Sequence, residues 1–425
     1  MSSVLHPEDE HFRRQSRMSV EAGAPKGLFR SKKEKKASAK ARAKADKHRS
    51  KTGGAGSSMP APVDASAADP RHTSKRVAWP RYAYYDVAFQ FFTEHVLDAE
   101  FVSLPEPTRK TIEVGASNSS DFVCAPFKHI MGDYIEALRA GADVIAQFTG
   151  PCRLGYYGEL QESILRDMGF DFEMLNFSEA AGHGIKAYID ICKKKVNPNM
   201  SVPVAAKNML ATLKMVEHLD AYDDYYLANA GFEVERGAFE RDRAQFFDDM
   251  RACTGPADVE QAFKAGMARV RAIPLDKPDD PIRIGLVGEY FTAVDAASNL
   301  YLEKKLFAMH VALARELGIS NRNIHYNEPN LRRAIPEYAK FDMGPTSTMT
   351  IEAAKRYAQE GFDGIVHMKS TGCTPEIDTM PVLQRLSRDL HIPILFLSYD
   401  SQTSDAGLDT RLEAFYDMVA MRKAR

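Results

Sequence analysis

The sequence predicts an α/β protein with two parallel-sheet units of Rossmann or flavodoxin-like type. In residues 76–183, and again in residues 281–425, short apolar segments typical of strands alternate with amphipathic helical segments. Residues 184–275 show helical spacing of apolar side chains without a strong strand signal, so we expect a helical segment between the two units. Residues 1–75 are predicted to form a disordered N-terminal tail.

The tail prediction rests on composition. Residues 30–51 contain eleven Lys or Arg residues and two acidic ones, and Gly, Ser, Ala and Pro dominate residues 53–68. Such a segment has too little apolar surface to fold alone. It is either a solvated tail or a segment that contacts nucleic acid or an acidic partner. Because the whole chain carries −2, the part after the tail is net acidic, and we expect no nucleic-acid groove in it.

The first unit is expected to begin near Val77. Its clearest helix is Phe127–Gly141, in which apolar residues recur at intervals of three and four. Pro126 suits the first position of that helix, and Gly141 suits the turn after its end. The other expected elements of this unit are a helix at Tyr82–His95, strands at Phe101–Leu104, Ala142–Phe148 and Phe172–Phe177, and a helix from about Tyr157 to Gly169.

The same spacing rules apply to the helical segment and the second unit. Asn299 is expected to cap a long helix that extends to Leu317, and Asn323–Tyr326 is a candidate strand. The remaining expected helices are Val204–Leu219, Glu233–Arg251, Ala257–Ala272, Thr348–Gly361, the segment from Ile377 to Leu390, and Leu408–Arg422. The remaining expected strands are Ile282–Val287, Asp363–His367 and Ile392–Ser398.

Composition also indicates in which compartment the protein is expected. No run of about 18 apolar residues occurs, so we expect no transmembrane helix and no membrane partner. Met1–Glu21 is polar and charged, and it lacks the apolar region of a secretory signal. Five cysteines in 425 residues do not indicate a disulfide framework. These features favour the cytoplasm, where thiols stay reduced and available as metal ligands.

Three cysteines stand at similar places in the predicted local structure. Cys124 directly precedes a helix, and Cys152 and Cys373 each lie between a predicted strand and the next helix. In an open α/β fold, ligands gather at the carboxyl ends of strands, where helix N-termini point and favour a thiolate. The three thiols therefore form either a shared metal or iron–sulfur site, or separate tight turns with buried thiols. Cys192 and Cys253 are expected to be structural.

Three thiolates would have a specific chemical consequence. A [4Fe–4S] cluster normally takes four cysteines. With three, one iron keeps an exchangeable position that can bind water or a substrate oxygen, as an open zinc site does.

Short motifs surround these cysteines in both units. They comprise Cys124–Lys128, Gly132–Leu138, Gly141–Asp143 and Gly150–Tyr157 in the first unit, and Gly285–Tyr290, Asp363–Val366, Gly372–Glu376 and Thr410–Phe415 in the second. In these motifs the chain resembles the 2-hydroxyacyl-CoA dehydratase superfamily, in particular dehydratase-like proteins associated with actin-like ATPase activators. The resemblance covers most of Val77–Arg425.

The resemblance implies a cofactor and partners. In that family pattern, Cys124, Cys152 and Cys373 hold one [4Fe–4S] cluster between the two α/β units, with an open iron site. A separate actin-like ATPase activator supplies a low-potential electron, and the acceptor is a CoA thioester or another difficult substrate. Dehydratases of this type pair two different subunits, so a second dehydratase-type subunit or a second copy of this chain is a further expected partner. This chain lacks a G-x₄-G-K-[ST] loop and is not expected to hydrolyse ATP itself.

Two further residues are catalytic candidates. Arg153 follows Cys152, and it either offsets the charge of the cluster, binds a CoA phosphate or forms a surface salt bridge. Glu289 ends a strand at the ligand edge of the second unit, and it is either a proton donor or acceptor or a helix cap.

The leading hypothesis is a dehydratase-like lyase or a reductase that acts through an iron–sulfur cluster in anaerobic metabolism. Two alternatives stay open at this point. The chain is either a non-catalytic electron-transfer or assembly component of an activase complex, or a metal-free α/β binding protein.

Overall fold

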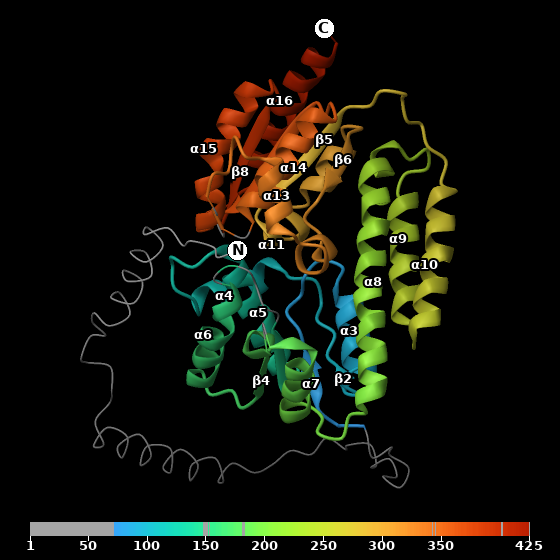
Figure 1. The fold of residues 1–425 in the computed structure, drawn as a ribbon, viewed down its shortest axis with the longest axis vertical. Helices are drawn as coiled ribbons and strands as arrows, with labels where there is room; N and C mark the ends of the chain where they lie inside the picture. Colours follow the sequence, from blue (N-terminus) through green and yellow to red (C-terminus); the bar gives the residue numbers. More distant parts are fainter. Residues whose placement is uncertain are drawn as a thin grey trace, which may run out of the picture. The chain divides into compact units, whose positions relative to one another are not determined.

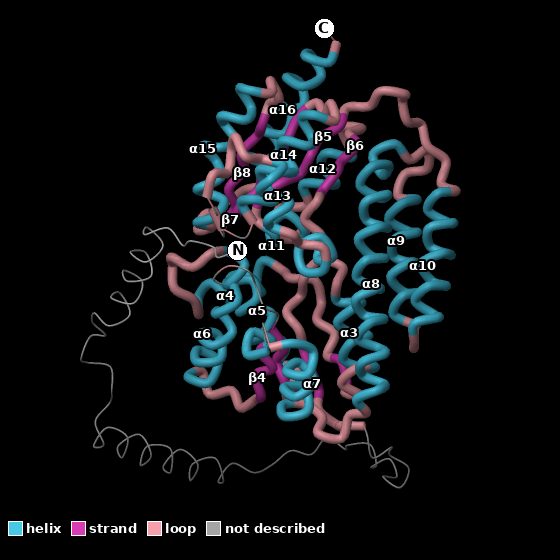
Figure 2. Tube along the Cα trace, viewed as in Figure 1, coloured by secondary structure: helices cyan, strands magenta, loops and turns pink. Residues whose placement is uncertain are grey.

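The computed structural model describes residues 72–147, 152, 154–180, 183–341, 343–344, 346–400 and 403–424, which belong to one compact unit. Two four-stranded parallel sheets with flanking helices organise this part of the chain (Figure 1, Figure 2). The predicted α/β class with two parallel-sheet units is therefore confirmed. All but the last four residues of the predicted tail lie outside the described residues.

Both sheets have the same strand order. The first runs β2-β1-β3-β4 and the second runs β6-β5-β7-β8, which is the flavodoxin-like order. Ligands of such sheets bind outside the carboxyl ends of the two central strands, where the chain changes direction across the sheet. The strands are β1 Arg76–Ala78, β2 Glu100–Phe101, β3 Val144–Gln147, β4 Glu173–Asn176, β5 Arg283–Gly288, β6 Ala312–Arg315, β7 Gly364–Ser370 and β8 Ile394–Tyr399.

The first sheet is flanked by helices α3 (Asp86–His95), α4 (Arg109–Ser117), α5 (Ala125–Arg139) and α6 (Leu154–Asp167). Helices α4 and α5 approach unusually closely through two glycines. A Cβ atom on Gly115 would lie 1.8 Å from the Lys128 carbonyl oxygen, and one on Gly132 would lie 2.3 Å from the Thr111 carbonyl oxygen. This close packing fixes the position of α5, whose N-cap residue is Cys124.

The predicted helical segment consists of α7 (Gly184–Lys195), α8 (Val202–Asn229), α9 (Ala238–Arg251) and α10 (Pro256–Arg271) (Figure 1). The 28-residue α8 packs against α3 of the first unit and β6 of the second. Phe246 of α9 is fully buried and stacks on Tyr222 of α8, with ring centroids 4.1 Å apart. Both sheets and this helical segment contribute to one continuous hydrophobic core.

A buried ion network links α8 to the second sheet. The Arg315 guanidinium at the end of β6 donates to Asp223 of α8 at 2.5 Å and also pairs with Glu303. Asp223 receives a second ion pair from Arg243 of α9 at 2.8 Å. Nearby, Asp220 of α8 accepts hydrogen bonds from the Ser320 amide and hydroxyl. These contacts tie the helical segment to the second unit.

In the second unit, two predicted elements are wrong. Asn299 does accept a hydrogen bond from the Leu302 amide at 3.1 Å, but the helix that follows is short, and Ala312–Arg315 forms strand β6 beside β5. His310 adopts a left-handed φ of +55° that turns the chain. The candidate strand at residues 323–326 does not form: a π-helical turn covers Ser320–Ile324, and residues 325–326 lie in the loop that follows it. The helices are α11 Tyr290–Val294, α12 Leu302–Phe307, α13 Glu328–Ala334, α14 Ser347–Gln359, α15 Thr374–Asp389 and α16 Asp405–Lys423.

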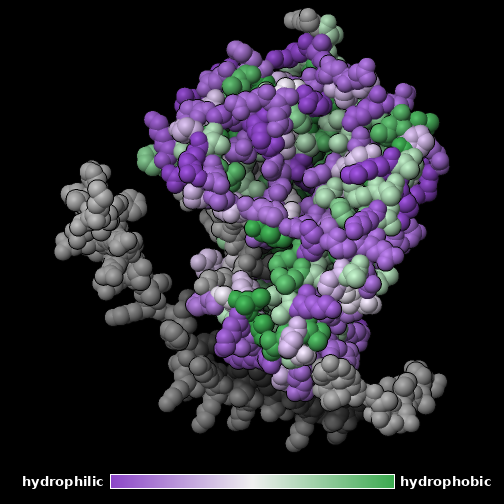
Figure 3. Space-filling view, turned by 45° about the vertical axis from the view of Figure 1, so that its right-hand side comes forward, coloured by the Kyte–Doolittle hydropathy of each residue, from purple (hydrophilic) through white to green (hydrophobic). Residues whose placement is uncertain are grey.

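The surface is mostly polar on the face drawn in Figure 3, where hydrophobic residues occur in small groups. Within the described part of the chain, no helix has the length and apolar character needed to cross a bilayer.

Candidate functional site

Two cysteines occupy the N-termini of helices at the carboxyl edges of the sheets. Cys124 is the N-cap residue of α5, and Cys373 is the N-cap residue of α15, which directly follows the central strand β7. Cys152 lies between the central strand β3 and α6. Pro follows both N-cap cysteines in the first helical turn, where its missing N–H costs nothing, so the sequence favours helix starts at Cys124 and Cys373.

All three cysteines line one cavity. Its volume is about 300 Å³, at the lower end of ordinary small-ligand sites. The first unit contributes Cys124 and Cys152, and the second contributes Cys373. The other lining residues are Pro126, Tyr157, Glu289, Met343, Gly372, Thr374, Pro375 and Asp378. The fold thus brings together three thiols that are separated by up to about 250 positions in the chain.

Short contacts hold the two sides of the cavity together. The Ala125 amide at the start of α5 donates a hydrogen bond to Ser370 Oγ at the end of β7, over 2.8 Å. Cys124 Sγ lies 3.4 Å from the Tyr157 hydroxyl of α6. A Cβ atom on Gly372 would lie 3.5 Å from Cys124 Cα. The two units therefore meet directly around the thiols.

Burial dominates the electrostatics of the two partly buried thiols. It raises the pKa of Cys124, although the Tyr157 hydroxyl and the Phe127 amide act in the opposite direction. It also raises the pKa of Cys373, and the Glu289 carboxylate adds to that increase. Removal of a thiolate from water therefore outweighs the helix N-terminus that was expected to favour it. Both groups are protonated thiols at neutral pH unless a metal displaces the proton.

Glu289 follows the central strand β5 and lies in the cavity wall. Its carboxylate caps α11 by accepting hydrogen bonds from the amides of Phe291 (2.7 Å) and Thr292 (3.0 Å). Burial raises its pKa, and these hydrogen bonds oppose the increase. Both sequence interpretations of Glu289 thus have a structural basis, because one residue caps the helix and borders the cavity.

Gly288 fixes the position of Glu289. It has a φ of +131°, and a Cβ atom there would lie 1.9 Å from the Met368 carbonyl oxygen of β7. The Glu289 amide donates to that same oxygen at 2.7 Å. Only glycine fits this conformation and this distance.

The cavity offers three cysteine sulfurs as donors. Among the described residues, no three His, Cys, Asp or Glu side chains are arranged to hold one metal ion. A cubane is larger than an ion and requires more widely separated thiolates. Three sulfur donors around one cavity, with the N-termini of α5, α6 and α15 nearby, suit an anionic iron–sulfur group. The role of the three cysteines as metal ligands stays a prediction.

The other predicted residues lie elsewhere or are not described. Arg153 lies outside the described residues. Cys192 and Cys253 are buried in the core, where burial raises the pKa of Cys192 to about 12 and that of Cys253 to about 11. Both are therefore structural, as expected.

Sequence reasoning missed several residues of the site. Tyr157 begins a predicted helix and was not a site candidate, yet its hydroxyl approaches Cys124. His367 of β7 is fully buried and hydrogen-bonded to Glu376 of α15, with Nε2 2.9 Å from Oε2. The signal for this pair was available, since His367 lies in a predicted strand and Glu376 lies three residues after Cys373.

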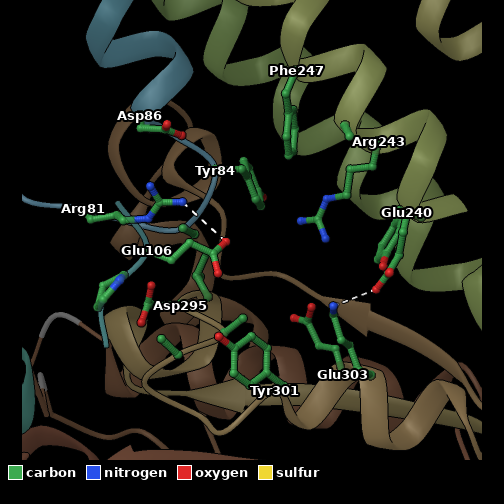
Figure 4. Close-up of a pocket in the computed structure, with 18 of the residues that line it drawn as sticks. Arg81, Tyr84, Asp86, Glu106, Glu240, Arg243, Phe247, Asp295, Tyr301 and Glu303 are labelled. Carbon is green, nitrogen blue, oxygen red and sulfur yellow. Dashed lines mark ion pairs between the residues drawn. The ribbon is translucent and has the colours of Figure 1, made fainter. Parts of the chain in front are cut away.

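A second cavity of about 380 Å³ lies between α9 and the segment around α11 and α12 (Figure 4). Its charged side chains pair mainly with one another, as in the ion pairs Arg81–Glu106 (3.6 Å) and Lys304–Glu240 (2.7 Å). The guanidinium of Arg243 lies against the rings of Tyr84 and Phe247. This cavity contains none of the cysteines.

Comparison with known protein families gives one finding. The family model of the 2-hydroxyglutaryl-CoA dehydratase D-component matches residues 243–419. The matched segment contains the whole second sheet with Glu289 and Cys373, and it leaves out Cys124 and Cys152. A comparison with curated proteins gives no match. The family match supports placing the chain in the superfamily that its motifs resemble.

Proposed function

We propose that this chain, as a protein of the 2-hydroxyacyl-CoA dehydratase superfamily, is an iron–sulfur component in which Cys124, Cys152 and Cys373 hold one [4Fe–4S] cluster with one open iron. An actin-like ATPase activator, as a separate chain, supplies a low-potential electron. The electron passes to a CoA thioester or a similarly difficult acceptor. The observation that carries the proposal is that all three cysteines line one cavity.

Electrostatics support an anionic group in this cavity. The helices α5 and α15 begin at Cys124 and Cys373, and α6 begins just after Cys152. Their N-termini carry unpaired amides and the positive ends of the helix dipoles. Since Cys124 and Cys373 are thiols when no metal is bound, cluster assembly would release protons.

When bound, such a cluster supplies a one-electron donor and an iron that can accept a substrate oxygen. The surrounding residues would position the ligands of the cluster and exclude water from it. Tyr157 approaches Cys124 Sγ and orients it. Glu289 holds its proton to a higher pH than an ordinary glutamate, so it is suited to give or take a proton at the cavity wall.

Exposed hydrophobic side chains support a protein partner at the cavity. Four large side chains that lie within two residues of cavity-lining positions are unusually exposed: Phe122 at 93%, Phe341 at 77%, Tyr156 at 76% and Ile377 at 45%. Contiguous exposed hydrophobic side chains mark interaction surfaces, and these four flank cavity-lining residues along the chain. We assign this surface to the activator, because an electron donor must approach the cluster.

Anaerobic purification with iron and sulfide analysis tests the proposal. We expect about four irons and four sulfides per chain. Changing Cys124, Cys152 or Cys373 to Ser should each remove most of the iron, and the matched change Cys192→Ala should not. Equal iron retention in all four variants would contradict the ligand assignment. A wild-type protein without iron or sulfide would contradict the function and favour a metal-free binding protein.

A second experiment separates catalysis from electron transfer alone. The loaded protein is mixed with ATP and an actin-like activator, and both cluster reduction and turnover of 2-hydroxyacyl-CoA substrates are followed. Reduction that requires ATP and the activator, together with turnover, is the expected result. Reduction without turnover of any substrate would favour a non-catalytic electron-transfer component.

A further inference from the structure

The second cavity, drawn in Figure 4, has an excess of acidic side chains. Its volume is about 380 Å³, and the described residues that line it include six acids and four bases. Each of the four bases already has a carboxylate partner. The pairs are Arg81 with Glu106 (3.6 Å), Arg251 with Asp86 (3.1 Å), Arg243 with Asp223 (2.8 Å) and Lys304 with Glu240 (2.7 Å). Such a cavity disfavours an anionic ligand and favours a cation.

Asp295 differs from the other five acids, because it forms no ion pair with any residue that the structure describes. It borders the cavity and is only 4% exposed. Its Oδ2 accepts a hydrogen bond from the Ser298 amide at 2.8 Å. Its Oδ1 accepts none from the described part of the chain. An aspartate is rarely buried in this way unless an opposite charge accompanies it.

The neighbours of Asp295 do not supply that charge. Burial lowers the pKa of His129, and the Asp295 carboxylate only partly offsets this decrease, so the imidazole is neutral at neutral pH. Its Nδ1 lies 3.1 Å from Ser298 Oγ. Asp133 is also buried nearby, and it adds a second acid instead of a cation. The carboxylate therefore lacks a counter-charge in this structure.

The cavity gives a ligand access to this carboxylate. The side chains of Glu106, Glu240 and Lys304 are more than half exposed, so solvent reaches that side of the cavity, whereas Asp295 is buried. The lining also includes the ring of Tyr301, which has the Lys304 ammonium 5.8 Å from its centroid. Aromatic rings attract cations through their faces. A small cation could thus enter from the exposed side and reach Asp295.

We propose that this cavity binds a small organic cation, whose primary ammonium or guanidinium group pairs with Asp295. Such a group is a hydrogen-bond donor with positive charge, and it matches an acceptor oxygen without a partner. A metal ion fits less well, because no three His, Cys, Asp or Glu side chains of the described residues are arranged to hold one. The cavity shares no described lining residue with the three-cysteine cavity, so the inference does not depend on the proposed function.

Isothermal titration calorimetry of the whole chain with putrescine and with agmatine tests the proposal. The buffer is potassium phosphate, because Tris is itself an organic ammonium. Butane-1,4-diol is the neutral control for putrescine, and magnesium chloride tests a metal ion. Asp295→Asn keeps the shape of the side chain and an acceptor for the Ser298 amide, and it removes the charge. The matched control is Asp190→Asn, since the Asp190 side chain is 58% exposed on α7 and does not line the cavity.

We expect at least one of the two amines to bind with one site per chain, and the diol not to bind. Asp295→Asn should weaken the binding of that amine by roughly tenfold or more, because the charge-assisted hydrogen bond is lost. Asp190→Asn should bind as the wild type does. Without ligand, Asp295→Asn should be at least as resistant to urea as the wild type, because it no longer buries an uncompensated charge.

Four results would overturn the inference. They are the absence of amine binding below about 1 mM, equal binding of the diol, unchanged amine affinity in Asp295→Asn, and binding of Mg²⁺ in place of the amines. If Asp295→Asn does not fold, the wild-type comparison decides. Binding of putrescine without binding of butane-1,4-diol would then support the cation site, and equal or absent binding of the two would refute it.

Discussion

The buried network around Arg315 gives the sharpest stability prediction. The Arg315 side chain is 2% exposed, and its partners Asp223 and Glu303 are 5% and 11% exposed. Arg315→Met would leave both carboxylates in the core without this guanidinium. Asp223 keeps its ion pair with Arg243, whereas Glu303 loses its only ion pair among the described residues. Breaking a buried pair of this kind costs about 3–5 kcal/mol of the free energy of unfolding.

The loss should depend on pH in a defined direction. Burial already raises the pKa of Glu303 in the folded protein, and removal of the Arg315 charge would raise it further. A carboxyl with a raised folded pKa binds its proton more tightly in the folded than in the unfolded state. The variant is therefore least destabilised below the unfolded pKa, and its deficit grows as pH rises through the folded pKa.

Urea denaturation at pH 5 and pH 8 measures both the loss of stability in Arg315→Met and its dependence on pH. Arg109→Met is the matched control, because Arg109 is 90% exposed and its pair with Glu113 is worth at most about 0.5 kcal/mol. A variant that combines Arg315→Met with Glu303→Gln should recover much of the loss, since Asp223 keeps Arg243 as its partner and position 303 no longer carries an unpaired charge. A single variant Arg315→Met within about 1 kcal/mol of wild type at both pH values would refute this reasoning.

Two further predictions concern packing. Gly288→Ala should lower the free energy of unfolding by at least about 1–3 kcal/mol, because a φ of +131° and a Cβ position 1.9 Å from the Met368 carbonyl oxygen exclude a methyl group. The control is Gly407→Ala in α16, where the nearest atom to a new Cβ would be 3.4 Å away. This change should alter the free energy of unfolding by less than about 1 kcal/mol in the same denaturation assay. Phe246→Ala should cost about 3–5 kcal/mol, since this ring is fully buried against Tyr222. Phe122→Ala, at a 93% exposed position, should leave the melting temperature unchanged, and equal effects of the two phenylalanine changes would contradict the packing assignment.

The sequence allowed prediction of elements in which local signals and burial agree. The helix α5 is one such element, because its apolar spacing, its proline in the first turn and Gly141 at φ +89° after its end all point to the same structure. The strand β5 is a run of apolar residues after Arg283 and is buried from Ile284 to Gly288, as a strand covered on both faces requires.

Other elements depended on tertiary contacts that no local pattern records. Ala312–Arg315 has the composition of a helix and becomes a strand because β5 lies beside it. The central strand β1 has only three residues and was not recognised at all. The approach of the Tyr157 hydroxyl to Cys124 likewise has no local signal, because it depends on how α6 packs beside α5.

The repeated strand order explains why thiols from both units reach one cavity. In each unit, one helix directly precedes the third strand and one follows it, namely α5 and α6 around β3, and α14 and α15 around β7. Thiols stand at the starts of α5, α6 and α15. The start of α14 has Thr346 instead, whose Oγ1 is buried without a hydrogen-bond partner among the described residues. The two units therefore offer four topologically equivalent helix starts and only three thiols. Thr346 is not among the described residues that line the cavity, so the fourth helix start adds no donor to the three thiols there.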